Sequence, residues 1–354
     1  MSTGASGGEG NAGWQLGRKP TGGWPQANDF HWFSGKVPEP ASGQVLTRTL
    51  WLSLDPYQWG RRRRGDEAPG DVCHGRTVSQ VIASRHEGYN EGDFVFSTAG
   101  WQRYGLLGED VSVFGYMFPR PIDPAIAPIS TAVGILGMLG LTAWSGVRIQ
   151  CDPRPGETVI VSAASGGVGQ AAGQIARQLG CRVVGIAGTP EKCAYVTEEL
   201  GFDACIQHST PDFPERLAQA CPAGADVYFE NVGGAVWEAV LPTLNPGARV
   251  SLCGLISQYG NTDGGDPFAA WQAVGAAVIE RQQVQIHKLF VGNFVADYQD
   301  QFLEEMAAWV KAGSVRYRED VRVGLENAPG AFADMLAGGN FGKTLVAVHP
   351  DPTR

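Results

Sequence analysis

The second half of the chain alternates short apolar segments with segments of helical periodicity. The short segments are apolar on both faces, whereas residues 190–200 and 213–220 have a helical pattern. Strands that are apolar on both faces are typical of a parallel sheet covered by helices on either side. From about residue 141 the pattern therefore predicts a doubly wound α/β fold, with parallel strands at residues 159–161, 181–187, 205–206, 225–229 and 248–253.

An all-β pattern precedes this region. Residues 44–54, 77–84 and 93–96 have the composition of strands and are separated by turn residues. After a long helix at residues 296–312, strands at residues 316–323 and 344–349 are expected to rejoin the first domain. The predicted organisation is a disordered, Gly- and Ser-rich N-terminus at 1–13, a discontinuous, mostly β domain at 14–140 and 315–354, and a dinucleotide-binding domain at 141–314.

A glycine cluster follows the first strand of the α/β region. Gly166, Gly167, Val168 and Gly169 separate the apolar run from a helical pattern that continues to residue 179. Glycines at such a junction let the backbone approach a pyrophosphate, whose charge is favoured at a helix N-terminus. Ala164 stands where the usual glycine motif begins, so this motif alone also fits a turn that binds nothing. The next strand has the spacing of a βαβ unit, which favours the dinucleotide site.

The end of that next strand indicates which dinucleotide binds. An NAD site has an acidic residue there for the adenine ribose, but here Thr189 and Lys192 offer a hydroxyl and an ammonium. A 2′-phosphate is attracted by an ammonium and repelled by a carboxylate, so the sequence predicts NADPH. Glu191 is the contrary observation, and behind Pro190 at a helix start it is expected to face solvent. The alternative for Lys192 is an ordinary surface lysine.

Three more loops are predicted at the carboxyl ends of strands, where ligands of open parallel sheets bind. Their candidate residues are Asn231 in residues 230–234, Cys253, Ser257 and Tyr259 in residues 253–259, and Phe290, Val291 and Gly292 in residues 290–293. Each loop alone is also consistent with ordinary turn chemistry. Together with the glycine cluster and Thr189, they predict one ligand-binding edge.

Charge narrows the classes of partner. The 354 residues carry a net charge of −9, from 27 basic and 36 acidic residues, which argues against nucleic acid or an anionic membrane as the main partner. The run of Arg61, Arg62, Arg63 and Arg64 is the exception. Its two interpretations are a solvated loop and a basic rim that attracts anionic substrates.

Cysteine usage and apolar runs indicate the compartment. Seven cysteines are scattered singly, which fits free thiols in a reducing environment. No signal-peptide pattern opens the chain, and no uninterrupted apolar stretch is long enough to span a bilayer. We therefore expect a cytoplasmic protein.

Hydride transfer without a metal or flavin needs a group that stabilises oxyanion charge. Cys73 and His74 are adjacent, but no further residue gives the spacing of a tetrahedral zinc site, so no metal is predicted. A tyrosine hydroxyl is a suitable donor. Tyr57 follows a first-domain strand, and Tyr259 lies in a loop that faces the expected cofactor. The alternative for each is a half-buried ring whose hydroxyl is satisfied at the surface.

These residues lie in longer motifs that carry a family resemblance. The motifs are residues 52–57, 100–102, 137–144, 163–169, 191–192, 230–234, 253–259 and 340–344. Over about residues 44–348 the chain resembles the zinc-independent medium-chain dehydrogenases/reductases, in the branch of prostaglandin reductases, plant alkenal double-bond reductases and bacterial NADPH-dependent curcumin reductase. The resemblance implies a Rossmann domain, a mostly β, GroES-like substrate domain, and a homodimer.

The resemblance also implies roles for the candidate residues. Gly167, Val168 and Gly169 would hold the pyrophosphate, and Lys192 the 2′-phosphate. The residues that would line the cofactor are Asn231, Cys253, Tyr259, Phe290 and Asn340. Tyr57 and Tyr259 would frame an enone substrate.

The chain departs from the branch at three places. Leu139 replaces the proline of a Met-Pro-Gly motif, and His208 replaces a tyrosine near the adenine. The arginine run replaces a Met-Arg-Gly-Arg-like stretch after Tyr57, beside the expected pocket.

The main hypothesis is an NADPH-dependent reductase of the C=C bond of α,β-unsaturated ketones and aldehydes. A hydride would reach the β-carbon, a tyrosine would stabilise the enolate, and Tyr259 or water would protonate the α-carbon. One alternative is a ketone or quinone reductase, or a secondary alcohol dehydrogenase, that uses the same site. A further alternative is a dinucleotide-binding protein without turnover.

Overall fold

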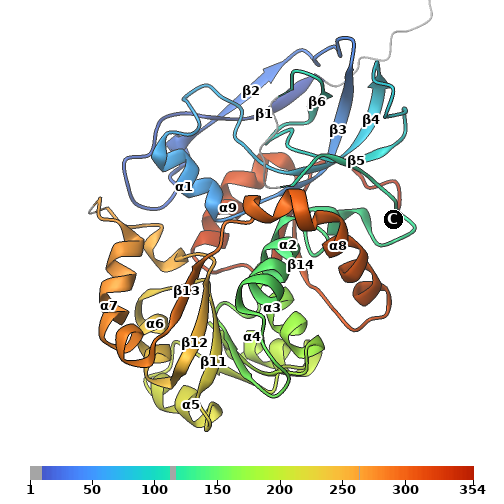
Figure 1. The fold of residues 1–354 in the computed structure, drawn as a ribbon. Helices are drawn as coiled ribbons and strands as arrows, with labels where there is room; N and C mark the ends of the chain where they lie inside the picture. The colour runs from blue at the N-terminus through green and yellow to red at the C-terminus, as the bar shows by residue number, and fades with distance from the viewer. Residues whose placement is uncertain (1–9, 112–116, 263) are drawn as a thin grey trace, which may run out of the picture.

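The computed structural model describes residues 10–111, 117–262 and 264–354. Figure 1 shows a mostly β part, drawn in blue, above an α/β part drawn in green to orange. The C-terminal elements, drawn in red, lie against the blue part rather than extending the α/β part.

The α/β part is built on a six-stranded sheet with the strand order β10-β9-β8-β11-β12-β13. All neighbouring strands pair in parallel, as the sequence predicted. The strands are β8 (Thr158–Val161), β9 (Arg182–Ala187), β10 (Ala204–Gln207), β11 (Ala225–Glu230), β12 (Leu244–Leu252) and β13 (Gln285–Lys288). Strand order reverses between β8 and β11, and ligands of doubly wound sheets bind at such a switch point.

Helices cover both faces of this sheet. The side chains of β8 alternate between two apolar clusters, with Val159 and Val161 in one and Ile160 in the other. The first cluster includes side chains of α2 (Met138–Trp144), α3 (Gly167–Gln178) and α8 (Gly292–Lys311). The second includes side chains of α5 (Phe213–Ala220), α6 (Gly234–Val240) and α7 (Pro267–Gln282). The short helix α4 (Pro190–Ala194) follows β9.

The mostly β part contains a seven-stranded sheet with the path β14-β15-β3-β4-β5-β7, to which β6 adds by pairing with β3. Its strands are β3 (Gln44–Ser53), β4 (Thr77–Ser84), β5 (Phe94–Ser97), β6 (Tyr104–Gly108), β7 (Arg120–Ile122), β14 (Glu319–Val323) and β15 (Lys343–Ala347). Because β15 pairs antiparallel with β3, the tail rejoins the first domain as expected. The helix α9 (Ala328–Leu336) connects β14 to β15, and α2 crosses the expected boundary at residues 140/141.

The structure corrects two expectations. The predicted disorder of residues 1–13 is wrong for residues 11–13, because β1 (Asn11–Leu16) pairs antiparallel with β2 (Phe30–Gly35); residues 1–9 lie outside the described residues. The solvated-loop interpretation of the arginine run is wrong too, because these residues end the helix α1 (Tyr57–Arg64). Arg62 is fully buried there, with its guanidinium carbon 4.6 Å from the Trp101 ring centroid and 5.1 Å from that of Phe332.

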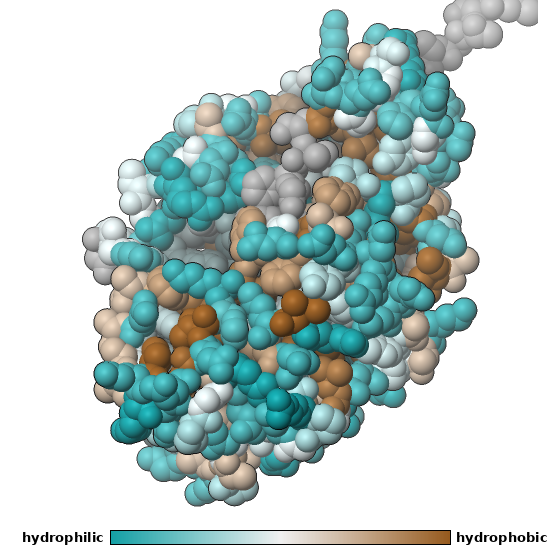
Figure 2. Space-filling view, in the orientation of Figure 1, coloured by the Kyte–Doolittle hydropathy of each residue, from teal (hydrophilic) through white to brown (hydrophobic). Residues whose placement is uncertain are grey.

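Polar residues dominate the face of the molecule that Figure 2 shows. On the face in Figure 2, hydrophilic residues cover most of the surface and hydrophobic residues form separate small patches. Among the described residues, none of the helices combines the length and hydropathy that crossing a membrane requires. The seven cysteines are free thiols.

Candidate functional site

The glycine turn opens α3 at the carboxyl end of β8. Gly166 is the residue before the helix, and the amides of the first turn, from Gly167 to Gly169, have no acceptor within an α-helix. A Cβ on Gly169 would overlap the carbonyl oxygen of Ala163, so the close approach of helix and strand requires glycine there. The turn therefore presents helix amides at the switch point of the sheet, where they can bind an anion.

The loop after β9 carries the predicted 2′-phosphate residues. The Thr189 hydroxyl accepts a hydrogen bond of 3.3 Å from the Lys192 amide and so caps α4. The Lys192 ammonium donates to the carbonyl of Gly338 at 2.8 Å. Burial lowers the pKa of Lys192, although the negative charges of Asp320 and Asp334 act to raise it.

Two further residues complete this end of the sheet. Glu191 is exposed in the first turn of α4, as predicted, and hydrogen bonds to its own backbone and to Thr189 lower its pKa. His208 follows β10, and its amide donates to Ala187 at 3.0 Å. A Cβ on Gly188 would lie 3.4 Å from the imidazole Nε2, so the His208 ring lies beside the end of β9.

Asn231 joins the loop after β11 to the loop after β8. Its amide donates to the Ser162 hydroxyl at 2.8 Å, and its side-chain Nδ2 donates to the Ser162 carbonyl at 2.7 Å. This contact fixes the two strands of the switch point against each other at the predicted cofactor edge.

The carboxylate of Glu230 also holds the loop after β11. Glu230 was not among the predicted residues. It is fully buried and accepts hydrogen bonds from Tyr228 (2.7 Å), Val232 (2.7 Å), Gly233 (3.0 Å), Trp271 (3.0 Å) and Ser162 (3.2 Å). Burial raises the pKa of Glu230, although hydrogen bonds from Val232, Tyr228, Gly233 and Trp271 act to lower it. Its position directly before Asn231 at a strand end was the signal available in the sequence.

The loop after β12 carries Tyr259. Its first residue, Cys253, donates its amide to the Glu230 carbonyl at 2.9 Å, and the Ser257 hydroxyl donates to the Val232 carbonyl at 2.6 Å. A Cβ on Gly254 would lie 3.1 Å from the Tyr259 hydroxyl oxygen. The tyrosine therefore folds back over the start of its own loop, close to the end of β12.

The remaining cofactor candidates border this edge. After β13, Phe290 is 51% exposed, Val291 is buried and Gly292 begins α8. Asn340 precedes β15, and its Nδ2 donates to the Gly342 carbonyl at 2.8 Å. The predicted cofactor residues thus come from all six strand ends and from the segment before β15.

Tyr57 begins α1 in the mostly β part. Its hydroxyl accepts a hydrogen bond of 2.8 Å from Arg76 Nη1 and forms a second one of 2.8 Å with His74 Nε2. Burial, followed by the charges of Arg76, Arg61 and Arg62, lowers the pKa of His74 to about 3, so this imidazole is neutral. Neither His74 nor Arg76 was predicted as a partner of Tyr57.

A buried ion pair connects Tyr57 with the glycine turn. Asp55 lies 2.7 Å from Lys343 and 3.5 Å from Arg76. Burial alone would raise the pKa of Asp55, but Lys343 and Arg76 lower it below its ordinary value. A Cβ on Gly167 would lie 3.4 Å from Lys343 Cδ and 3.0 Å from Leu139 Cδ2. The cluster that holds Tyr57 therefore packs against the predicted pyrophosphate turn.

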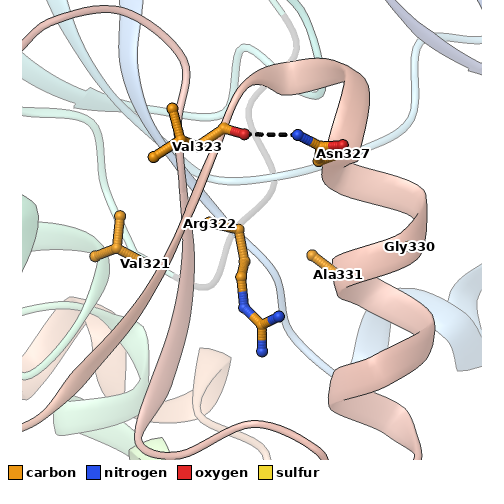
Figure 3. Close-up of a pocket in the computed structure, with 6 residues that line it drawn as sticks. All are labelled: Val321, Arg322, Val323, Asn327, Gly330 and Ala331. Atoms are coloured by element: carbon orange, nitrogen blue, oxygen red, sulfur yellow. Dashed lines mark hydrogen bonds between the residues drawn. The ribbon is translucent and has the colours of Figure 1, made fainter.

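Two other features bear on where a ligand could bind. Within residues 10–111, 117–262 and 264–354, no three His, Cys, Asp or Glu side chains are grouped so that they could hold a metal ion. A pocket between β14 and α9 is lined by Val321, Arg322, Val323, Asn327, Gly330 and Ala331, none of which is a predicted site residue (Figure 3). Its Arg322 already pairs with Asp320 at 3.0 Å and Asp334 at 2.8 Å, so we assign this pocket no role.

Comparison with known proteins identifies the family of the chain. Residues 167–309 match the family described as "Zinc-binding dehydrogenase", and residues 13–112 match "N-terminal domain of oxidoreductase". The chain is 42% identical to the NADPH-dependent curcumin reductase of Escherichia coli (96% of this chain, 98% of the relative) and 37% identical to the NADP(+)-dependent 2-alkenal reductase of Nicotiana tabacum (88% and 89%). The crystal structure of CurA in complex with NADPH from Vibrio vulnificus superposes with a TM-score of 0.86 at 39% identity, over 96% of this chain and 100% of that one. The chain therefore belongs to the zinc-binding dehydrogenase family of medium-chain oxidoreductases, in the branch of the curcumin and alkenal reductases that the sequence motifs predicted.

Proposed function

We propose that this chain is an NADPH-dependent reductase of the C=C bond of α,β-unsaturated ketones and aldehydes. The observation that carries the proposal is the junction of two clusters. The glycine turn and Lys192 provide a phosphate-binding edge, and the side chain of Lys343 connects that edge to the buried cluster around Tyr57. Relatives named as an NADPH-dependent curcumin reductase and an NADP(+)-dependent 2-alkenal reductase support the same reaction.

The residues at the edge fit NADPH. The first-turn amides after Gly166 suit the pyrophosphate, and Lys192 with Thr189 suits the 2′-phosphate. The end of β9 carries no acid, and the first carboxylate that follows it in the sequence, Glu191, is exposed. When bound, NADPH supplies the hydride that the β-carbon of the enone accepts.

Tyr57 stabilises the negative charge that develops on the substrate carbonyl oxygen. Arg76 polarises the phenol by donating to its oxygen, and His74 does the same in the tautomer whose hydrogen is on Nε2. With both neighbours donating, the phenol hydrogen is directed to the enolate oxygen. A well-placed donor of this kind contributes about 3 kcal/mol to stabilisation of the transition state. Tyr259, from the loop after β12, or a water molecule protonates the α-carbon.

The test is a steady-state assay of NADPH oxidation with a conjugated enone and with the matched saturated ketone. We expect turnover of the enone alone, with the saturated carbonyl compound as product. Tyr57→Phe should lower kcat about 100-fold, because one oxyanion donor is removed. Tyr89→Phe, outside the site in the mostly β part, is the control and should behave like the wild type. Reduction of the saturated ketone, or an allylic alcohol product, would contradict the proposal.

The proposal includes a homodimer in the cytoplasm. Within the described residues β13 pairs with β12 alone, so the sheet has an open edge at which a second copy can add. Light scattering after size-exclusion chromatography should give twice the chain mass of 37.7 kDa. The free cysteines support a reducing compartment, which cell fractionation tests.

A further inference from the structure

Arg63 joins the mostly β part to the loop that carries Tyr259. From the last turn of α1, its Nη1 donates to the carbonyl of Tyr259 and its Nη2 donates to the carbonyl of Asn261, each at 2.5 Å. Both acceptors are backbone atoms, so this contact fixes the path of the loop rather than the rotamer of one side chain. Hydrogen bonds from a charged donor are stronger than neutral ones.

A second contact holds the residue between these two carbonyls. A Cβ on Gly260 would overlap the indole ring of Trp24, so the ring lies directly on that glycine. The segment of Trp24 is itself held by α1, because Trp59 Nε1 donates to the Gly23 carbonyl at 2.9 Å. Residues 259–261 are therefore held by α1 directly and through a segment that α1 anchors.

The helix that makes these contacts is fixed in place. Arg62 is buried against Trp101 and Phe332, and its Nε donates to Glu67 at 3.2 Å. Tyr57 lies at the start of the same helix, six residues before Arg63, which corresponds to about 9 Å along the helix axis. One rigid element thus carries one site tyrosine and holds the backbone of the other.

We propose that Arg63 is a positioning residue that fixes the separation of Tyr57 and Tyr259 and thereby selects enones by size. This inference rests on the proposed function, since it assumes that both tyrosines border the substrate. It differs from the basic-rim interpretation of the arginine run, in which Arg63 would act on the charge of the substrate. In the structure the Arg63 guanidinium instead donates hydrogen bonds to the loop carbonyls.

The neighbouring Arg64 provides a matched control. Its side chain is 62% exposed and pairs with Asp66 at 2.9 Å, so Arg64→Ala removes the same charge without touching the loop. The variants to compare in the full chain are Arg63→Ala, Arg63→Lys and Arg64→Ala. Lysine keeps the charge, but its donors are all on one nitrogen and lack the planar two-pronged geometry of the guanidinium, so it should restore the function in part.

The first measurement is kcat and KM with a short 2-alkenal and with a bulky diaryl enone, both uncharged. Arg63→Ala should lower kcat for the short substrate about tenfold, the equivalent of one charge-assisted hydrogen bond, and change the bulky substrate much less. Arg64→Ala should keep the wild-type ratio between the substrates. A carboxylate-bearing enone is assayed as a third substrate. An equal loss with both uncharged substrates, or a loss confined to the carboxylate-bearing enone, would overturn the size-selection role.

The second measurement is hydrogen–deuterium exchange of residues 255–262 without cofactor, together with the melting temperature of each variant. Arg63→Ala should speed exchange in this segment about tenfold, whereas Arg64→Ala should not. If Arg63→Ala is globally unfolded, Arg63→Lys decides the same comparison. If Arg63→Ala exchanges faster but the wild type reduces no enone, the proposed function fails although Arg63 holds the loop. If the wild type reduces enones but Arg63→Ala and Arg64→Ala have the same exchange rate or the same substrate ratio, the role of Arg63 is overturned.

Discussion

Replacement of Lys192 by alanine should weaken the binding of NADPH and leave that of NADH unchanged. The ammonium now donates to the Gly338 carbonyl at 2.8 Å, and this contact is exchanged for the 2′-phosphate when NADPH binds. The net gain is therefore at the lower end of the range for a hydrogen bond to a charged group, about 1.5 kcal/mol. That free energy corresponds to about a tenfold increase in the Kd of NADPH.

Fluorescence titration with both nucleotides measures this difference. Lys192→Arg keeps the charge and should retain most of the preference for NADPH. Glu191→Gln is a second control, because this exposed carboxylate should contact neither nucleotide. The reasoning is refuted if Lys192→Ala keeps the wild-type ratio of the two Kd values, or if Glu191→Gln weakens NADH binding.

Two further predictions concern the turn and the buried ion pair. Gly169→Ala forces its Cβ against the Ala163 carbonyl. We therefore expect a loss of about 1–3 kcal/mol in the free energy of unfolding, and weaker NADPH binding. An unchanged melting temperature would contradict the packing argument. Asp55→Asn leaves the buried Lys343 ammonium without a carboxylate and should cost about 3–5 kcal/mol in urea unfolding at pH 7. Because the folded pKa of Asp55 is below its ordinary value of 3.8, this stabilisation is present above about pH 4 and is lost as the pH falls through the folded pKa. The wild type and variant should therefore converge in acid, and a constant difference would exclude the carboxylate as the cause.

The parallel sheet could be predicted because its strands are short, apolar and spaced by helices. Strands buried on both faces leave a local signature, and the side chains of β8 do divide between two cores. The carboxyl ends of parallel strands meet at one edge, so Lys192 and Asn231 could be assigned to the same edge before their contacts were known.

The first domain was less predictable because its contacts are remote in sequence. The arginine run has the composition of a solvated segment, since arginine is rarely buried. Arg62 is nevertheless buried, because Phe30, Trp101 and Phe332 surround its guanidinium from distant segments. The composition of the arginine run therefore does not predict that aromatic side chains from distant segments enclose one of its residues.

The same limit applies to the site. Tyr57 was predicted from its motif, but its partners His74 and Arg76 follow it by 17 and 19 residues and carry no pattern of their own. Asp55 and Lys343 both lie in motifs that were recognised, yet 288 residues separate them, and only the pairing of β15 with β3 brings the two motifs together.

The measurement that tests the central claim most directly uses NADPH with both hydrogens at C4 of the nicotinamide replaced by deuterium. A conjugated enone is reduced with this nucleotide, and the product is analysed by NMR. The account predicts a saturated carbonyl compound with the deuterium on the former β-carbon. Deuterium on the carbonyl carbon, or the absence of product while the protein binds the nucleotide, would contradict it.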